Sequence, residues 1–351
     1  LGTSYAALGD RNTDYDKWNQ AAAAYREALE AWSREEVPLD WAGANNNLGT
    51  MLRTVGNYDK DAGKVAALTR GEIPIHEPGL DELVERNAAA KRLSFTTDLS
   101  AAVRHAEAVF IAVGTPSRRG DGHADLSYVY EAAREIANAL TGFKVVITKS
   151  TVPVGTGDEV ERIIRETAPK AEFAVVSNPE FLREGAAIRD FKLPDRVVVG
   201  AEGERARAVM TELYRPLFIN RNPVMFTDRR TAELIKYAAN AFLATKIAFI
   251  NEVADLAEKV GADVQEIARG IGLDNRIGAK FLHAGPGFGG SCFPKDTLAL
   301  LKTGQDNAAP LRIVEAVVAS NDQRKRAMAR KVTALAGELR GKTVAVLGLT
   351  F

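Results

Sequence analysis

The chain has 351 residues, of which 46% are hydrophobic and 26% charged, as expected for a globular protein of two or three domains. Lys+Arg and Asp+Glu both number 46, so the balanced charge argues against a nucleic-acid or membrane partner. No apolar run approaches the length of a membrane span, and no signal peptide is visible. A single cysteine excludes an internal disulfide and fits a reducing, cytoplasmic location. Both ends, Leu1 and Phe351, resemble cuts in a longer chain.

Residues 1–56 differ in character from the rest of the chain. LGTSYAALG at residues 1–9 resembles LGTMLRTVG at residues 48–56, and the Ala-rich stretch between them has helical spacing of apolar residues. This pattern predicts an α-helical segment similar to tetratricopeptide repeats, with two helices that match by chance as the alternative. One and a half repeats would be marginally stable, because each repeat buries its apolar face on its neighbours.

From about residue 57 the pattern becomes an alternation of strands and helices. Strands are expected at 108–113, 143–148, 173–176 and 196–200. Helices are expected at 125–140 and from the end of the KSTVPVGT stretch, residues 149–156, to about residue 167. Near-continuous apolar strands separated by helices predict an α/β fold with a parallel, Rossmann-like sheet covered on both faces. Ligands bind such sheets at the carboxyl ends of the strands, where Gly114, Ser150 and Asn178 are expected.

Asp59 precedes a predicted helix and has Lys64 nearby. An acidic residue between a strand and a helix holds a cofactor ribose in dinucleotide folds, although an Asp in this place is more often a helix cap. The sequence before Asp59 shows neither a strand nor the G-x-G-x-x-G turn that binds pyrophosphate. We therefore expect an incomplete sheet that lacks its first strand and the strand that should carry Asp59.

The second half of the chain is predicted to be mainly helical. Residues 228–261 form one long helix that is apolar over most of its circumference, which favours burial against a second subunit as a homodimer. Shorter helices are expected at 263–271 and roughly 308–339. Residues 341–351 read as the first strand of a further, truncated domain.

The stretch GPGFGGSCFPKDTLAL, residues 285–300, contains the single cysteine, Cys292. Its glycines permit a loop that wraps a ligand, and Pro294 fits the first turn of a helix. Asp296 would lie in that turn, and Lys295 is placed to lower the pKa of the thiol. A thiol, a carboxylate and an ammonium beside a flexible loop predict covalent catalysis, with a buried structural cysteine as the alternative.

Three polar pairs have i, i+4 spacing: Glu180 with Glu184, Lys236 with Asn240, and Cys292 with Asp296. On a helix each pair would share a face, although such pairs are common on solvated surfaces. Lys236 and Asn240 differ because they interrupt the most apolar helix of the chain. Burying a lysine is costly unless the ammonium is paired, so a functional role is expected there.

Four motifs, KSTVPVGT, NPEFLREG, ELIKYAANAFLATKIAFINE and GPGFGGSCFPKD, resemble the nucleotide-sugar dehydrogenases, above all those that act on UDP-glucose. The resemblance runs from about residue 57 to 351. It implies a four-electron oxidation of UDP-glucose to UDP-glucuronate, by two hydride transfers to NAD. GDP-mannose and UDP-N-acetylhexosamines are alternative substrates. A non-catalytic remnant whose repeat helices bind a protein partner is the alternative from another class.

The resemblance also implies a role for individual residues, and it implies no metal site. The implied catalytic residues are the nucleophile Cys292, the water-orienting Asp296, the oxyanion-stabilising Lys236 and Asn240, and Glu180 and Thr151 beside the reacting centre. The implied NAD contacts are Asp59, Lys64, Thr115, Thr151, Glu184 and Lys295. The implied substrate contacts are Glu180, Phe181, Leu182, Lys236, Asn240, Phe281, His283, Gly285, Gly289 and Gly290, with Arg276 reaching the substrate of a neighbouring subunit.

These patterns divide the chain into four expected parts. They are a repeat-like segment at 1–56, a partial NAD-binding domain at 57–203, a central helical domain for dimerisation and catalysis at 204–337, and the start of a truncated UDP-binding domain at 338–351.

Overall fold

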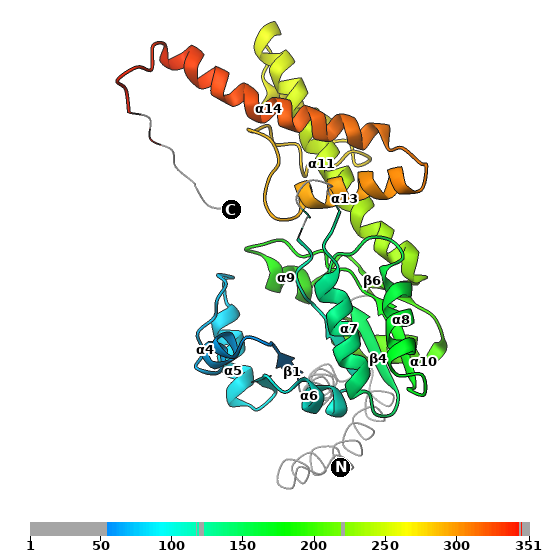
Figure 1. Cartoon of the computed structure of the whole chain (residues 1–351). Coiled ribbons are helices and arrows are strands. Elements are labelled where there is room, and N and C mark those ends of the chain that lie inside the picture. The colour runs from blue at the N-terminus through cyan, green and yellow to red at the C-terminus, as the bar shows by residue number, and fades with distance from the viewer. Residues whose placement is uncertain (1–54, 117, 119–122, 219–221, 344, 346–351) are drawn as a thin grey trace, which may run out of the picture. The chain divides into compact units, whose positions relative to one another are not determined.

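The structure is a computed structural model that describes residues 55–116, 118, 123–218, 222–343 and 345 (Figure 1). Nearly all of the predicted repeat-like segment and most of the last predicted strand lie outside these residues. The chain divides into two compact units. The first comprises the chain up to residue 112, residues 130–149 and 157–229, and the second comprises 113–129, 150–156 and the chain from residue 230.

A five-stranded sheet forms the centre of the first unit, in the order β3-β4-β5-β6-β7. Its strands are β3 (Ala108–Ile111), β4 (Lys144–Thr148), β5 (Phe173–Ser177), β6 (Val197–Ala201) and β7 (Val224–Thr227). β3, β4 and β5 are parallel, β6 is antiparallel to β5, and β7 is parallel to β6. The predicted α/β class is confirmed, but the expectation of an all-parallel sheet is wrong. A buried strand has the same apolar pattern in either direction, so the sequence could not show the reversal at β6.

The four strands expected from the sequence correspond to β3, β4, β5 and β6. All five residues of β4 and of β6 are buried, as expected for strands covered on both faces. The strand β7 was not predicted, because its apolar run, VMF, is shorter than the run AVFIAV at 108–113 that contains β3.

Two further strands, β1 (Val55–Tyr58) and β2 (Leu93–Thr96), pair in parallel with Val55 opposite Leu93. The helices α4 (Ala62–Thr69) and α5 (Leu80–Ala89) connect them, and α6 (Leu99–His105) follows. The expectation that no strand carries Asp59 is therefore wrong, because β1 ends at the residue before it. The sequence of β1, VGNY, contains a glycine and an asparagine, both unfavourable in strands, which hides it from a pattern search.

The other helices of the sheet region are α7 (Ser127–Ala139), α8 (Thr156–Thr167), α9 (Ala187–Lys192), α10 (Glu204–Tyr214) and the short 3₁₀ turn η1 (Arg215–Leu217). They lie around the strands in Figure 1. Buried side chains of α10, Met210 and Tyr214 among them, pack on Val145, Val176 and Val199 of three neighbouring strands. This apolar layer fixes the strand ends from which the functional loops emerge.

The second unit is built on the long helix α11 (Arg229–Val260), followed by α12 (Val264–Gly272), α13 (Phe293–Asp306) and α14 (Arg312–Ala336) (Figure 1). The helices predicted at 228–261, 263–271 and 308–339 are confirmed, with ends that differ by a few residues. Tyr237 and Ala241 of α11 pack on Leu300 of α13 and Val314 of α14, so the three helices share one apolar core. No helix among the described residues has the length and apolar character needed to cross a membrane.

Polar contacts continue the packing of α14 on α11. Ser320 donates to Glu252 at 2.6 Å, Arg324 pairs with Asp255, and Lys331 pairs with Glu258 at 2.6 Å. The partners advance in the same direction along both helices, so α11 and α14 run in the same sense where they cross (Figure 1).

Candidate functional site

Cys292 immediately precedes α13, and Pro294 lies in the first turn of that helix, as the sequence predicts. The backbone N–H of Asp296 donates to the carbonyl of Cys292 at 2.9 Å. The cysteine is partly exposed, and its Sγ lies 3.5 Å from Oγ of Ser291. A thiol at a helix N-terminus, reachable from solvent, is suited to act as a nucleophile.

Asp296 is completely buried, with 0% of its surface exposed, and both of its carboxylate oxygens are used. Nδ2 of Asn240 donates to Oδ2 at 2.6 Å, and the ammonium of Lys295 donates to Oδ1 at 2.5 Å. A buried carboxylate is tolerated only with such partners. The structure thus brings together Asp296, Asn240 and Lys295, three of the residues singled out in the sequence.

One face of the N-terminal half of α11 carries a row of buried polar side chains. Glu233, Lys236, Tyr237 and Asn240 are 2%, 4%, 2% and 7% exposed, and their spacing places them on one side. Burial, and then the negative charges of Asp296 and Glu233, raise the pKa of Tyr237. The phenol therefore remains a neutral hydrogen-bond donor at physiological pH.

Two loops that follow strands of the sheet are joined in the second unit. Oγ1 of Thr115 donates to the carbonyl of Thr151 at 2.9 Å, and Oγ of Ser150 donates to the carbonyl of Val113 at 2.7 Å. Glu233 of α11 accepts from the backbone N–H of Gly155 at 2.7 Å. The loop that carries Thr151 is therefore fixed both to its neighbour and to the polar row of α11.

The Gly-rich loop at residues 285–290 is held by side chains that the sequence did not single out. Asn251, Asn321 and Arg324 bond its backbone, and all three are buried. Their only sequence signal is that each is a polar residue on a packed helix, which is too common to be informative.

Phe281 lies in a left-handed conformation, with φ of 65°, and its ring meets that of Phe293 edge-on at 6.1 Å. His283 is exposed. Arg276 is also exposed, and its guanidinium pairs with Asp274 at 2.6 Å. In the described part of the chain, the contacts of Arg276 do not include the group around Asp296, and its predicted role toward a neighbouring subunit stays a prediction.

In the first unit, Asp59 directly follows β1. Its carboxylate accepts from the ammonium of Lys64 at 2.5 Å and from the backbone N–H of Asp61 at 3.0 Å. The hydrogen bond from Lys64, followed by that from Asp61, lowers the pKa of Asp59. The alternative that Asp59 caps the next helix is wrong, because Asp61 caps α4 by accepting from the N–H of Lys64 at 3.1 Å.

Glu180 and Glu184 lie in a loop between β5 and α9, so their i, i+4 spacing does not place them on one helix face. Gly185 in this loop has φ of 78°, a conformation incompatible with a continuing helix. Glu180 accepts from the backbone N–H of Leu182 at 2.6 Å, and the guanidinium of Arg196 stacks 4.0 Å from the ring centre of Phe181. Both interactions fix the course of the loop.

Both ends of this loop are anchored to other parts of the first unit. At its start, Nδ2 of Asn178 donates to the carbonyl of Val198 at 2.7 Å, and Oδ1 accepts from Lys149 at 3.2 Å. At its end, the carboxylate of Glu77 accepts from the backbone N–H groups of Gly185 and Ala187, both at 2.8 Å. Glu77 thereby serves as the N-terminal cap that α9 does not have in its own sequence.

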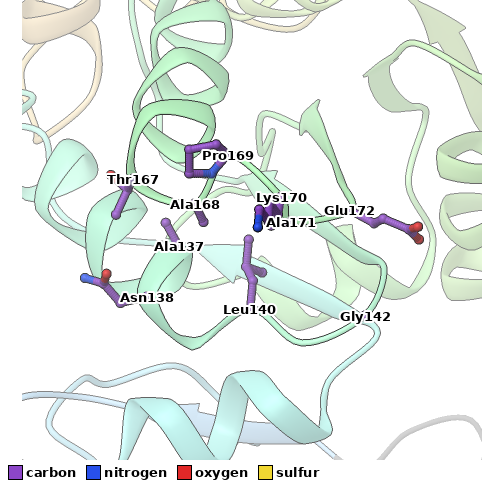
Figure 2. A pocket seen from close by; sticks show the side chains of 10 residues that line it. All are labelled: Ala137, Asn138, Leu140, Gly142, Thr167, Ala168, Pro169, Lys170, Ala171 and Glu172. Carbon is purple, nitrogen blue, oxygen red and sulfur yellow. The ribbon is translucent and has the colours of Figure 1, made fainter.

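A pocket of about 720 Å³ lies elsewhere in the first unit. Figure 2 shows its lining side chains, which include Ala137, Leu140, Ala168, Lys170 and Glu172. These residues lie at the C-terminal ends of α7 and α8 and in the segments that lead from them to the amino ends of β4 and β5. Ligands of open α/β sheets bind at the opposite, carboxyl ends, and none of the predicted site residues lines this pocket.

Comparison with known proteins identifies the family. Residues 47–218 match the NAD binding domain of the UDP-glucose/GDP-mannose dehydrogenase family, and residues 230–323 match its central domain. The chain is 72% identical over 296 residues to a UDP-glucose 6-dehydrogenase of Rhizobium meliloti, covering 84% of this chain and 68% of that protein. The chain belongs to the UDP-glucose/GDP-mannose dehydrogenase family.

Other family members agree with this assignment. The UDP-glucose 6-dehydrogenase TuaD of Bacillus subtilis is 48% identical, over 86% of this chain and 66% of that protein. A UDP-glucose dehydrogenase structure from Pyrobaculum islandicum superposes with a TM-score of 0.78 at 43% identity, over 81% of this chain and 66% of that one. The chain therefore spans about two thirds of the length of these relatives.

The cofactor of the family's N-terminal domain is NAD, and the described part of that domain fits the ribose end of this cofactor. A carboxylate directly after a parallel strand is the group that accepts hydrogen bonds from ribose hydroxyls. Asp59 has this place after β1, and its ionised form is stabilised by Lys64. Residues 1–54, where the pyrophosphate-binding turn would precede β1, lie outside the described residues.

The predicted site residues fall into two groups, one in each unit. Asp59, Lys64, Glu180, Phe181, Leu182 and Glu184 belong to the first unit. Thr115, Thr151, Lys236, Asn240, Arg276, Phe281, His283, Gly285, Gly289, Gly290, Cys292, Lys295 and Asp296 belong to the second. The second group holds the predicted nucleophile together with Asp296 and its bonded partners Asn240 and Lys295.

Proposed function

We propose that the chain catalyses the NAD-dependent four-electron oxidation of UDP-glucose to UDP-glucuronate through a covalent intermediate on Cys292. The observation that carries this proposal is the placement of Cys292 at the start of α13, one turn before a buried Asp296 that is bonded to Asn240 and Lys295. The 72% identity to a UDP-glucose 6-dehydrogenase supports the choice of reaction.

The proposed residues divide the chemistry between them. Lys236 and Asn240 donate hydrogen bonds to the sugar C6 oxygen as negative charge develops on it. The sulfur of Cys292 adds to the aldehyde carbon formed by the first oxidation, and the resulting thiohemiacetal becomes a thioester in the second. Water then hydrolyses the thioester, with Asp296 orienting the water and Glu180 assisting the proton transfer. NAD, when bound, accepts one hydride in each oxidation, so each sugar consumes two NAD.

The remaining assignments support these steps. Asp59 and Lys64 hold the cofactor ribose, while Thr115, Thr151, Glu184 and Lys295 make further contacts to the cofactor. The resemblance to the family also assigns Thr151 and Glu184 to the reacting centre. The proposed substrate contacts are Glu180, Phe181, Leu182, Phe281, His283, Gly285, Gly289 and Gly290.

UDP-glucose is preferred over the other substrates of the family because identity is higher to proteins that act on it. A GDP-mannose dehydrogenase structure from Pseudomonas aeruginosa is 32% identical, with a TM-score of 0.62. A UDP-D-ManNAc dehydrogenase structure from Pyrococcus horikoshii is 26% identical, with a TM-score of 0.72. Both sequence identities lie below the 43% and 72% identities to proteins named as UDP-glucose dehydrogenases.

A homodimer formed through α11 is part of the proposal. Phe242, Phe249, Leu256 and Val260 are large apolar residues of this helix, and each is more than half exposed. The first three recur every seven residues, which places them on one face. A row of exposed apolar side chains on a single helix is self-complementary and suits a symmetric contact with a second copy. Arg276 would then reach the substrate of the partner.

The expected parts at 57–203, 204–337 and 338–351 remain in the proposal, except that α10 and β7 belong with the first of them because they pack on and extend its sheet. The repeat-like segment is proposed as a site for a protein partner on the basis of the Ala-rich stretch with helical spacing at residues 21–32. The family match begins at residue 47, so any such segment is confined to the residues before it. A cytoplasmic location is supported by the need to keep the Cys292 thiol reduced.

Turnover of UDP-glucose tests the proposed function directly. Purified chain is given UDP-glucose with excess NAD, and NADH is measured by absorbance while the sugar product is measured by mass. We expect two NADH per UDP-glucuronate. Absence of both turnover and NAD binding would favour a non-catalytic remnant. A kcat/KM that is higher with GDP-mannose than with UDP-glucose would overturn the assignment of UDP-glucose as the substrate.

Cys292→Ser is expected to abolish formation of UDP-glucuronate, because a serine hydroxyl is a far weaker nucleophile than a thiol and leaves poorly from an ester. Rates are compared by mass detection of the acid product. Thr303→Ser, a conservative change on α13, serves as the control and should retain the parent rate. Formation of the acid at the parent rate by Cys292→Ser would remove the cysteine from the reaction.

A further inference from the structure

Three buried polar side chains bond the backbone of the Gly-rich loop, and the proposed chemistry uses none of them. At the start of the loop, Asn251 accepts from the N–H of Gly285 at 2.8 Å, and Nε of Arg324 donates to its carbonyl at 2.9 Å. Asn251 and Arg324 are 3% and 9% exposed. Buried side chains bonded to main-chain atoms fix a loop far more firmly than surface contacts do.

Asn321 of α14 makes the tightest of these contacts. Its Oδ1 accepts from the backbone N–H of Phe288 at 2.7 Å, and its Nδ2 donates to the carbonyl of the same residue at 3.0 Å. The amide thus uses a donor and an acceptor on a single residue, as a neighbouring β-strand would. We call this pair of bonds the Asn321 clamp.

Gly287 shows how closely α14 approaches the loop. Its φ of 122° is a conformation that side-chain-bearing residues rarely adopt, and a Cβ there would lie 2.7 Å from Oδ1 of Asn321. Glycine is therefore required on two independent grounds, and one of them is the clamp itself.

The clamped residue connects the loop to the cysteine. The side chain of Phe288 is buried and packs with Ala248 of α11 and Val317 of α14. Its ring also meets that of Phe293 edge-on, with centroids 6.2 Å apart and planes at 84°. Phe293 is the first residue of α13 and directly follows Cys292. The clamp therefore acts on the residue whose ring supports the start of α13.

We propose that Asn321 is a positioning residue that sets the place and the accessibility of the Cys292 thiol through Phe288 and Phe293. The geometrical part of this inference stands by itself, whereas its consequence for turnover rests on the proposed function. Asn321 bonds only the loop backbone in the contacts described, so it acts through the cysteine and does not take part in the chemistry.

Asn321→Ala tests the clamp without any need for turnover. Loss of its two hydrogen bonds should speed amide hydrogen exchange at Phe288 by about tenfold, since each bond contributes modestly to local stability. The rate of alkylation of Cys292 by iodoacetamide should change by about threefold or more in the same variant. Both are measured by mass spectrometry on the full chain.

Ser320→Ala is the matched control. It removes the neighbouring contact between α14 and Glu252 of α11 and leaves the loop contacts in place. Parent-like exchange and alkylation in this control, with altered rates in Asn321→Ala, support the proposal. Unchanged rates in Asn321→Ala, or equal changes in both variants, overturn it.

Gly287→Ala probes the same contact from the loop side and serves if Asn321→Ala does not fold. Its Cβ should displace the Asn321 amide and change Cys292 alkylation. In the double variant Gly287→Ala with Asn321→Ala, the steric conflict is removed, so the combined change should be smaller than the product of the single changes. Independent effects, or no effect of Gly287→Ala, contradict the clamp.

Turnover provides the functional readout. A misplaced thiol should capture the aldehyde less efficiently, so Asn321→Ala is expected to lower the NADH yield per UDP-glucose below two. The parent yield in this variant, with altered alkylation, would overturn the link to catalysis. If the parent chain itself shows no turnover, the proposed function fails. The hydrogen-exchange and alkylation rates still test whether the Asn321 clamp positions the Cys292 thiol.

Discussion

Asp296 is the residue on which the candidate site depends most. Its carboxylate is completely buried and accepts one hydrogen bond from Asn240 and one from Lys295, at 2.6 and 2.5 Å. A buried charge of this kind is stable only while both partners remain. The group therefore links local stability to the proposed water-orienting role.

Asp296→Asn is expected to lower both stability and activity. The asparagine keeps the shape of the side chain but removes its charge, so Lys295 loses its ion pair. The new NH₂ group also faces the donors of Asn240 and Lys295, with which it cannot form the same hydrogen bonds. We expect the free energy of unfolding to fall by about 1–3 kcal/mol, measured by urea unfolding. We expect kcat to fall by about 10² or more, because the group proposed to orient water is lost.

Asp306→Asn is the control for this experiment. Asp306 lies on the same helix and pairs with Lys302 at 2.8 Å, but its side chain is 46% exposed. Exposed pairs contribute little, so its stability should stay within about 0.5 kcal/mol of the parent. If the two variants lost the same free energy of unfolding, burial of the Asp296 carboxylate would not be the cause of the loss.

The sequence shows some residues of the site and conceals others, for a physical reason. Lys236 and Asn240 could be found because polar side chains in an apolar helix are costly, and Cys292 because it is the single cysteine beside clustered glycines. Asn251 and Asn321 bond main-chain atoms 34 and 33 residues away. A main-chain partner has no sequence signature, so only the fold reveals these contacts.

At the scale of elements, long apolar segments were predictable and short ones were not. α11, α14 and the strands β3 to β6 follow from their apolar patterns. β1, β2 and β7 contain no more than three consecutive apolar residues, whereas β3, which also has four residues, belongs to the longer apolar run AVFIAV at 108–113. Glu180 and Glu184 have helical spacing, yet they lie in a loop, and Gly185 after them has positive φ, a conformation that does not continue a helix.

The packing of α14 on α11 is expected to weaken in acid. Burial raises the pKa of Asp255, but hydrogen bonds from Arg324 and Lys331 outweigh this effect and lower the pKa below its usual value of 3.8. A carboxyl whose pKa is lowered by folding stabilises the fold above its unfolded pKa, and this contribution is lost as pH falls through the folded pKa. Asp255 therefore favours the folded chain above about pH 4.

Asp255→Asn is expected to reduce this acid sensitivity. The difference in the free energy of unfolding between pH 5 and pH 3 should be smaller in the variant than in the parent, as measured by urea unfolding at both pH values. Ser320→Ala, which removes a contact between the same helices without removing a titratable group, should lower stability equally at both. A parent-like difference in Asp255→Asn would rule out this carboxyl as a source of the sensitivity.

At the scale of the whole molecule, the sequence predicted a buried apolar helix, and the structure leaves part of that helix exposed. Phe242, Phe249 and Leu256 are 66%, 53% and 60% exposed in the single chain. Exposing such side chains to water is unfavourable, and covering them with the same face of a second copy removes that cost. The prediction of an apolar helix and the proposal of a homodimer thus rest on the same residues.

Phe249→Glu should therefore prevent self-association. The parent chain is expected to elute at twice its 37.9 kDa mass in size-exclusion chromatography with light scattering, and the variant at the single-chain mass. A glutamate at the centre of a symmetric contact would face its own copy, so burial of two like charges would oppose association. Leu335→Glu on α14 replaces a leucine that is 90% exposed but lies on another helix, and it should elute with the parent. A parent that elutes at the single-chain mass, or a Phe249→Glu variant that keeps the doubled mass, would show that this face of α11 is not the contact between subunits.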